Sequence, residues 1–329
     1  MFKLLNYSIF NKIFVYLDKK KNMKFKIFVF VAAVISSNIE ILTAQTIPKE
    51  ELTFLTSEWK GERFPDGRPK IADNLLERAK KIGIDDAWQV LKVMGYTNQF
   101  EHGWKTLNDD MITGRAVTAM FMPTRPDIEK NLKTRGAQQG RVGNTNSWPI
   151  ATLTKGDVYV ADGFGKIVAG TLMGSTLATS IYTKSGNGVI FDGAARDVQG
   201  LEEIKGFNAF VRDFHPSFME DMVLMGLNTP IRIGRTMAVP GDLVIAGKIG
   251  VLFVPAHLAE HVVSTAEFIV RRDKYAFEVI KSGKFSSGQL DSEWTSEIKD
   301  DFIKWMEKHP EEGKMTRAEL DVIMSKRTW

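Results

Sequence analysis

The stretch 170–197, GTLMGSTLATSIYTKSGNGVIFDGAARD, decides the fold that we expect for this chain. It reads as a turn, a helix from Ser175 to Lys184, and an apolar strand from Gly188 to Phe191. The helix opens with Gly174 to Leu177, so its first backbone N–H groups have no partner within the helix and lie at the positive end of its dipole. Such a helix start suits a carboxylate or a phosphate, although Ser and Thr are also ordinary helix-capping residues.

Two charged residues, Arg196 and Asp197, follow this strand at the edge where α/β proteins commonly bind ligands. An Arg guanidinium can donate two parallel hydrogen bonds to a carboxylate, and an Asp carboxylate can hold a hard cation such as Mg²⁺. The alternative is a surface ion pair at a helix start, worth at most about 1 kcal/mol. Together with the helix start, the pair predicts a site for a small anion and a divalent cation.

Strand-like and helix-like segments alternate on both sides of this stretch, which predicts an α/β domain. The expected strands are 115–122, 157–161, 208–211, 242–246 and 251–254, with a short helix at 198–203 and a polar loop at 134–147. Gly156-Asp157-Val158 and Gly241-Asp242-Leu243 echo one another. We interpret the echo as the same turn chemistry before two strands and not as a repeat.

Helical periodicity dominates the two flanks of this domain. It is clearest at 71–82 before the domain and at 256–281, 294–306 and 317–324 after it. We therefore divide the chain into a leader, a helical N-terminal segment, an α/β core and a helical C-terminal extension. Their expected bounds are 1–44, 45–110, 111–265 and 266–329.

The leader has the layout of a secretory signal peptide: lysines up to Lys26, an apolar run from Ile27 to Ile35, and small residues ending at Ala44. We expect cleavage near Ala44, export to the periplasm or medium, and no stable membrane insertion afterwards. If Met23 is the true start or the leader is spurious, the protein is cytoplasmic. The chain has a net charge of +4, and the leader accounts for all of its positive excess, so we expect no nucleic-acid partner.

Three other patterns offer competing explanations. His257-Leu258-Ala259-Glu260-His261 matches the His-x-x-Glu-His pattern of some zinc proteases, but it starts an amphipathic helix and has no evident third ligand. Gly163-Phe164-Gly165 follows a strand, yet its spacing indicates a tight turn and not a dinucleotide-binding loop. The tryptophans expected as core or interface anchors are Trp59, Trp88, Trp104 and Trp148.

Four separated blocks resemble, in order and spacing, the family of ribonuclease-activity regulator A-like proteins. They are 173–179 (MGSTLAT), 191–197 (FDGAARD), 240–244 (PGDLV) and 250–255 (GVLFVP). That family includes 4-hydroxy-4-methyl-2-oxoglutarate aldolases and oxaloacetate decarboxylases, and some members carry the label dimethylmenaquinone methyltransferase. The resemblance spans Asp85 to Val263.

The resemblance implies an α/β fold with a three-layer β/β/α core of the swivelling-domain type, with helical extensions. It also implies a homotrimer with its sites between subunits. Arg196 would bind the substrate, and Asp197 would hold Mg²⁺ directly or through water. The carboxylate of a pyruvoyl group would be bound by the backbone of Gly174, Ser175, Thr176 and Leu177.

Two departures from the family pattern concern proton transfer. Aldolase members typically have an acidic residue where this chain has Ser175, and Ser cannot serve as that base; losing a general base costs roughly 10²–10⁴ in rate. Ala246-Gly247-Lys248 stands where the family often has a second acid. The replacing group stays open, and Asp213, His215 and Glu220 are candidates by their position downstream.

The expected activity is that of a Mg²⁺-dependent lyase acting on a small 2-oxo acid. It would cleave a C–C bond of a 4-hydroxy-2-oxo or 4-carboxy-2-oxo acid, by retro-aldol cleavage or decarboxylation, to give pyruvate. The alternative is a non-catalytic ligand-binding or protein-regulating member that lost the proton-transfer acid at Ser175. A ribonuclease regulator is disfavoured because an exported protein would not meet a cytoplasmic ribonuclease.

Overall fold

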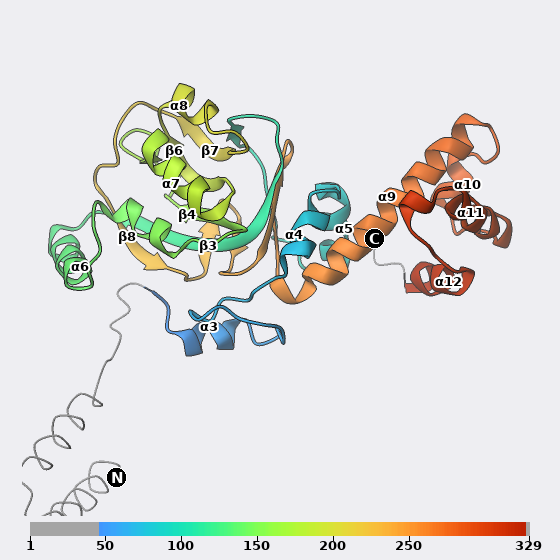
Figure 1. Ribbon diagram of the computed structural model, residues 1–329, viewed down its shortest axis with the longest axis horizontal. Helices are drawn as coiled ribbons and strands as arrows, with labels where there is room; N and C mark the ends of the chain where they lie inside the picture. Colours follow the sequence, from blue (N-terminus) through green and yellow to red (C-terminus); the bar gives the residue numbers. More distant parts are fainter. Residues whose placement is uncertain (1–45, 327–329) are drawn as a thin grey trace, which may run out of the picture. The chain divides into compact units, whose positions relative to one another are not determined.

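The long strand β3 (Ile112–Pro123) is the central strand of the main sheet (Figure 1). In this computed structural model, which describes residues 46–326, its first residues pair antiparallel with β11 (Leu243–Gly247) and its middle pairs parallel with β4 (Asp157–Asp162). Its last residues pair antiparallel with β8 (Met222–Leu227). Residues 112–119 of β3 are all buried, as is typical of a strand covered on both faces.

Parallel strands and helices alternate on one side of β3. β4 pairs with β6 (Val189–Ala195), β6 pairs with β7 (Ala209–Phe214), and β5 (Thr171–Met173) joins the end of β6, all in parallel. Helices α7 (Ser175–Ser185) and α8 (Val198–Glu202) connect these strands and lie over the same part of the sheet (Figure 1). Parallel neighbours need such crossovers, so the alternation expected from the sequence is confirmed.

Antiparallel strands complete the sheet on the other side. β11 forms a hairpin with β12 (Gly250–Val254), and β9 (Ile231–Ile233) pairs with β10 (Thr236–Ala238) in a separate small sheet. The strand order of the main sheet is β1-β12-β11-β3-β4-β6-β7-β2. The two very short strands β1 (Phe100–Glu101) and β2 (Lys105–Thr106) are its edge strands.

Apolar side chains on the two faces of these strands define the layers. One face of β4 and β6, with Tyr159 and Phe191, packs against α7. The opposite face, with Val160, packs against Phe253 of β12 and the residues of β9 and β10. Two β layers with helices on one side are the three-layer β/β/α core expected from the sequence, which is thereby confirmed.

The N-terminal flank adds a further helical layer outside β11 and β12. It contains α3 (Lys49–Leu55), α4 (Asp73–Ala79) and α5 (Ile84–Val93). The last two pack with the start of the long helix α9 (Ala259–Lys281) on the outer face of the hairpin, with Leu252 beneath them. This flank is not wholly helical, because β1 and β2 lie within it and join the sheet.

The C-terminal extension has an apolar core of its own. The second half of α9 packs with α10 (Ser287–Asp291), α11 (Ser296–Lys308) and α12 (Arg317–Lys326) around Tyr275, Phe302 and Trp305. Short 3₁₀ turns complete the chain; they are η1 (Thr145–Ser147), η2 (Pro149–Thr152), η3 (Ala256–Leu258) and η4 (Pro310–Glu312). Within residues 46–326 no helix is both long and apolar enough to cross a membrane.

One segment differs from its expected structure. Residues 134–138, expected in a loop, form the end of α6 (Pro126–Gln138). Pro126 at the first helical position and Asp127 and Glu129 in the first turn favour helix initiation, so the helix continues into the Gly/Gln-rich residues. The predicted signal peptide lies outside the described residues.

Candidate functional site

The start of α7 has no side-chain cap from its own N-cap residue. Gly174 is the N-cap residue with extended backbone (φ −122°, ψ −171°), and no side-chain cap hydrogen bond is made there. The backbone N–H of Ser175 instead donates to Asp197 Oδ2 at 3.3 Å. The helix start and the end of β6 thus meet at the Asp197 carboxylate.

Arg196 and Asp197 project from the turn between β6 and α8. Asp197 has a left-handed backbone (φ +62°), which is uncommon for a residue other than glycine. Its Oδ1 lies 3.5 Å from Nη1 of Arg196, and the Arg196 guanidinium lies 4.5 Å from the ring centre of Phe218. Stacking on an aromatic ring holds the planar guanidinium without using its hydrogen-bond donors.

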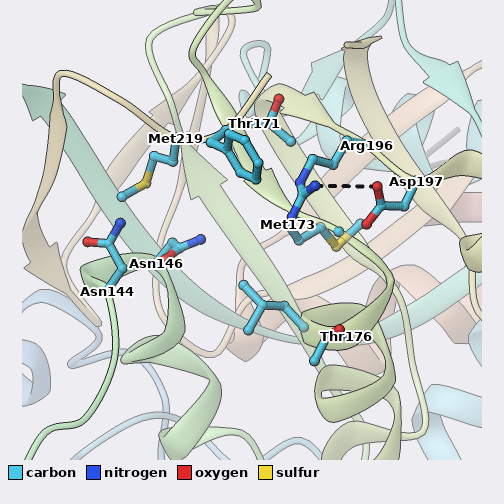
Figure 2. A pocket seen from close by; sticks show the side chains of 11 residues that line it. Asn144, Asn146, Thr171, Met173, Thr176, Arg196, Asp197 and Met219 are labelled. Atoms are coloured by element: carbon cyan, nitrogen blue, oxygen red, sulfur yellow. Dashed lines mark hydrogen bonds and ion pairs between the residues drawn. The ribbon is translucent and has the colours of Figure 1, made fainter. Parts of the chain in front are cut away.

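These groups border a cavity of about 190 Å³ (Figure 2). Figure 2 shows Arg196 turned toward Asp197 on one side, with Asn144 and Asn146 on the other. The lining residues are Asn144, Asn146, Thr171, Met173, Gly174, Thr176, Leu177, Arg196, Asp197, Phe218 and Met219. The volume suits a small organic acid and is below the range usual for drug-sized ligands.

The structure therefore brings most of the predicted site residues to one cavity. Gly174, Thr176, Leu177, Arg196 and Asp197 line it. Ser175 does not line it, because its side chain lies against α8, where a Cβ added to Gly200 would be 2.8 Å from the Ser175 Cβ. Position 175 contributes no side chain to the cavity, and its backbone N–H donates to the lining residue Asp197.

A cation bound in this cavity would be coordinated by oxygen atoms, with Asp197 as the carboxylate among the described lining residues. Within residues 46–326 no group of three or more His, Cys, Asp or Glu side chains is placed to hold a metal ion. The side chain of Asp197 is 39% exposed. Mg²⁺ keeps several waters and binds through one or two carboxylates plus substrate oxygens, so Asp197 fits Mg²⁺ and not a four-ligand zinc site.

The three downstream candidates for proton transfer lie in different surroundings. Asp213 forms an ion pair with Lys105 at 2.5 Å, and this hydrogen bond lowers the pKa of its carboxyl. Glu220 is exposed and contributes its backbone groups to Ala169 and Lys166. Only His215, of these three, is linked by side-chain hydrogen bonds toward a residue that lines the cavity.

The other sequence patterns lie away from this cavity. Glu260 of the His-x-x-Glu-His pattern accepts hydrogen bonds from Arg78 and Ser264, and the His257 ring lies 3.4 Å from the Tyr96 hydroxyl. Phe164 and Gly165 both have positive φ, as a tight turn requires. Of the tryptophans, Trp148 is buried among the apolar residues between α7 and the sheet, and the Arg212 guanidinium lies 4.0 Å from the ring centre of Trp104.

The sequence analysis did not identify several lining residues. Asn144 and Asn146 come from the loop before η1, and Phe218 and Met219 from the loop after β7. No regular spacing in the sequence identifies these four residues, because two loops that are distant in the sequence come together at the cavity only in the folded protein. The amide of Asn146 donates to the backbone oxygen of Leu172 at 2.7 Å, which fixes this wall to β5.

This arrangement defines an α/β protein with a small polar cavity between a helix start and the end of a parallel strand. The RraA-like family model, described as Aldolase/RraA, matches residues 69–253. The match covers more than half of the chain, so the protein belongs to the RraA-like family. The resemblance drawn from four sequence blocks is thus confirmed, whereas α9 to α12 lie beyond the matched residues.

Individual proteins are also similar to this chain in sequence or in fold. An uncharacterised protein of Methanocaldococcus jannaschii is 23% identical over 209 residues, which cover 62% of this chain and 93% of that protein. A protein of Pseudomonas syringae pv. tomato has a similar crystal structure, with a TM-score of 0.54 at 20% identity over 68% of this chain and 98% of that one. RraAS2 of Streptomyces coelicolor, described as an unusual member of the RNase ES inhibitor RraA protein family, gives a TM-score of 0.53 at 21% identity over 63% of this chain and 97% of that one.

Proposed function

We propose that the protein is a divalent-metal-dependent lyase that cleaves a C–C bond of a small 2-oxo acid to give pyruvate. The observation that carries this proposal is the convergence of Arg196, Asp197 and the start of α7 on one cavity of about 190 Å³. The family description, Aldolase/RraA, is in accord with it. The substrate class is a 4-hydroxy-2-oxo or 4-carboxy-2-oxo acid.

Each group has a separate role in binding this substrate. The backbone N–H groups from Gly174 to Leu177 and the Arg196 guanidinium bind the carboxylate, because a helix N-terminus and a guanidinium both favour a bound anion. Phe218 holds the guanidinium plane by stacking. Asp197 would hold Mg²⁺, which, when bound, polarises the 2-oxo group and stabilises negative charge on its oxygen.

Retro-aldol cleavage also needs a group that removes the proton of the 4-hydroxyl and later delivers one to C3. Among the lining residues in the described part of the chain, Asp197 is the only carboxylate, and it is committed to the cation in this proposal. Ser175 carries no acid and turns away from the cavity. Proton transfer therefore depends on hydroxyl or imidazole groups of the surrounding loops.

The activity is tested by pyruvate release from oxaloacetate with and without Mg²⁺, in a coupled assay. We expect release above the spontaneous rate that depends on Mg²⁺ and is inhibited by oxalate, an analogue of the pyruvate enolate. Asp197→Ala should remove the Mg²⁺ dependence while the protein stays folded, since this side chain is exposed. No Mg²⁺-dependent release from any 4-hydroxy-2-oxo or 4-carboxy-2-oxo acid would contradict the proposal.

A non-catalytic role is the second candidate, and the missing acid at Ser175 favours it. In that role the same cavity binds a small anion without turnover. Calorimetric titration with oxalate separates the two functions, because binding without pyruvate release indicates a ligand-binding or regulatory protein.

We further propose that the chain is exported after cleavage near Ala44 and assembles as a homotrimer. The leader and the resemblance support these statements, and exposed apolar side chains such as Val168 and Phe218 lie in loops bordering the cavity. Intact mass of the protein from envelope fractions tests the first statement, and light scattering tests the second. A monomer at micromolar concentration, or a cytosolic chain that keeps its leader, would contradict them.

A further inference from the structure

The loop after β7 places an imidazole behind the cavity in a defined hydrogen-bonding state. The backbone N–H of Ser217 donates to Nδ1 of His215 at 3.2 Å, and the Ser217 hydroxyl lies 2.9 Å from the same nitrogen. A backbone N–H can only donate, so Nδ1 accepts and carries no proton in this arrangement. His215 is thus a neutral base aimed at the Ser217 hydroxyl.

The Ser217 hydroxyl connects this base to the cavity. Its Oγ accepts from the backbone N–H of Ala169 at 2.7 Å and lies 3.5 Å from Oγ1 of Thr171. The Thr171 side chain lines the cavity, and its hydroxyl also lies 3.2 Å from the backbone oxygen of His215. Hydroxyl protons rotate freely, so Thr171 can turn its proton from that oxygen to Ser217.

The backbone around His215, Ser217 and Thr171 has strained dihedral angles and is held by hydrogen bonds. Ala169 and Asp221 have φ values of +58° and +54°, which is unusual for residues other than glycine. The backbone N–H of Glu220 donates to the oxygen of Ala169 at 2.9 Å, and that of His215 donates to the oxygen of Ala195 at 3.0 Å. Strain of this kind persists where the surrounding structure fixes it, and it clusters at functional sites.

We propose that Thr171, Ser217 and His215 form a proton relay that takes the place of the acid missing at position 175. This inference rests on the proposed lyase function. In cleavage, the 4-hydroxyl gives its proton to Thr171 Oγ1, Thr171 gives its own to Ser217 Oγ, and Ser217 gives its own to His215 Nδ1. The C3–C4 bond then breaks, leaving a carbonyl compound and the pyruvate enolate.

The relay runs backwards to finish the reaction. The proton on His215 Nδ1 returns through Ser217 and Thr171 to C3 of the enolate, which becomes the methyl group of pyruvate. The imidazole is again neutral and all protons are accounted for. Only Thr171 touches the substrate; Ser217 and His215 act through it.

Exchange of the methyl protons of pyruvate in D₂O tests the relay apart from C–C cleavage. Proton NMR of pyruvate with Mg²⁺ and the full chain follows the loss of the methyl signal. We expect His215→Asn, Ser217→Ala and Thr171→Val each to slow the exchange by roughly 10²–10⁴-fold, as removal of acid–base catalysis does. Thr171→Ser keeps a hydroxyl and should retain most of the rate.

Controls separate proton transfer from folding. His261→Asn, at an exposed histidine on α9, should leave exchange unchanged. Oxalate affinity, measured by calorimetry, should stay within about twofold of wild type in all relay variants. The double variant His215→Asn/Ser217→Ala should be about as slow as either single variant, because both changes interrupt one relay.

The outcomes distinguish the relay from the function on which it rests. Exchange by wild type that persists in the three variants overturns the relay and leaves the lyase proposal standing. Loss of oxalate binding in every slow variant also overturns the relay, since it shows a structural role. No exchange by wild type, together with no pyruvate release, overturns both.

Discussion

At the scale of single residues, the cavity depends on the missing side chain at Gly174. A Cβ at this position would lie 2.3 Å from Asp197 Oδ2, far inside van der Waals contact. Glycine therefore lets the carboxylate approach the first N–H groups of α7, one of which donates to it at 3.3 Å. The start of α7 and the Asp197 carboxylate are adjacent because this one residue is small.

Arg196→Ala removes the only guanidinium that lines the cavity. We expect oxalate binding in the presence of Mg²⁺ to weaken by about 2 to 3 kcal/mol, because charge-assisted hydrogen bonds to the carboxylate are lost. Calorimetric titration measures the change. Arg232→Ala, at an exposed arginine of β9, is the matched control. Equal affinities in wild type and Arg196→Ala would remove this residue from the site.

At the scale of elements, the same turn precedes the two strands that flank β3. Gly156 and Gly241 have φ values of +83° and +90° and lead into β4 and β11. In each case the buried aspartate that follows accepts a hydrogen bond from the backbone N–H three residues before it, at 2.9 Å for Asp157 and 2.8 Å for Asp242. The similarity between the two stretches of sequence therefore reflects the same type of turn before each strand, as expected.

The two aspartates differ in their charge partners. Asp157 lies 3.3 Å from Arg68 and 3.4 Å from Arg115, both buried. For Asp242 only backbone hydrogen bonds, from Val239 and Ala256, oppose the effect of burial. Burial raises the pKa of the Asp242 carboxyl to about 8 from its ordinary value of 3.8.

This raised pKa makes stability depend on pH with a definite sign. Between about pH 4 and pH 8 the unfolded chain has Asp242 ionised while the folded chain keeps it protonated, so its contribution to folding falls as pH rises, by up to about 1.4 kcal/mol per unit. Asp242→Asn stays neutral and should lose this slope. Urea unfolding of both proteins at pH 5 and pH 8 measures it, and an unchanged stability difference between the two pH values would contradict the prediction.

Hydrophobic runs predicted the larger elements well. The expected strands at 157–161 and 251–254 and the helix at 175–184 agree with β4, β12 and α7 to within a residue at most positions. Two- and three-residue strands such as β1 and β9 were missed, because they are too short to show any periodicity and form only through pairing with distant strands.

Some residues of the candidate site could likewise be predicted from the sequence, and others could not. Arg196, Asp197 and the start of α7 were predictable because each lies at a junction of elements that the local pattern marks. Thr171, Asn146 and Phe218 were not, since three separate segments bring them to the cavity and only the tertiary fold places them there. The roles of all these residues stay predictions until the binding and exchange experiments are done.

At the scale of the whole molecule, α9 belongs to two apolar cores. Its first half packs with α4 and α5 outside the β11–β12 hairpin, and its second half packs with α10 to α12. In the second core Phe302 is fully buried, with its ring centre 5.3 Å from that of Tyr275 and 6.0 Å from that of Trp305. The extension is thus attached to the family core through one continuous helix.

Phe302→Ala should destabilise this extension by about 3 to 5 kcal/mol, the usual cost of emptying a large aromatic site. Hydrogen exchange followed by mass spectrometry should show faster exchange in residues 282–326, while β4 and β6 stay protected. Oxalate affinity is the control and should not change, because Met173 and Leu177 of the cavity belong to the apolar cluster beneath α7, which is separate from the core around Phe302. Parallel loss of protection in β4 and β6 would show that the two cores unfold together.

The packing of α4 against α9 also sets the order in which the chain acquires its structure. Arg78 on α4 donates to Glu267 on α9, a partner 189 residues further along the chain. At a synthesis rate of 5–20 residues per second, that partner leaves the ribosome roughly 10 to 40 s after Arg78 does. The part of the α4 and α5 surface that α9 covers stays exposed throughout that interval, even after β11 and β12 have been made, so this apolar surface of the nascent chain remains open to chaperones until α9 follows.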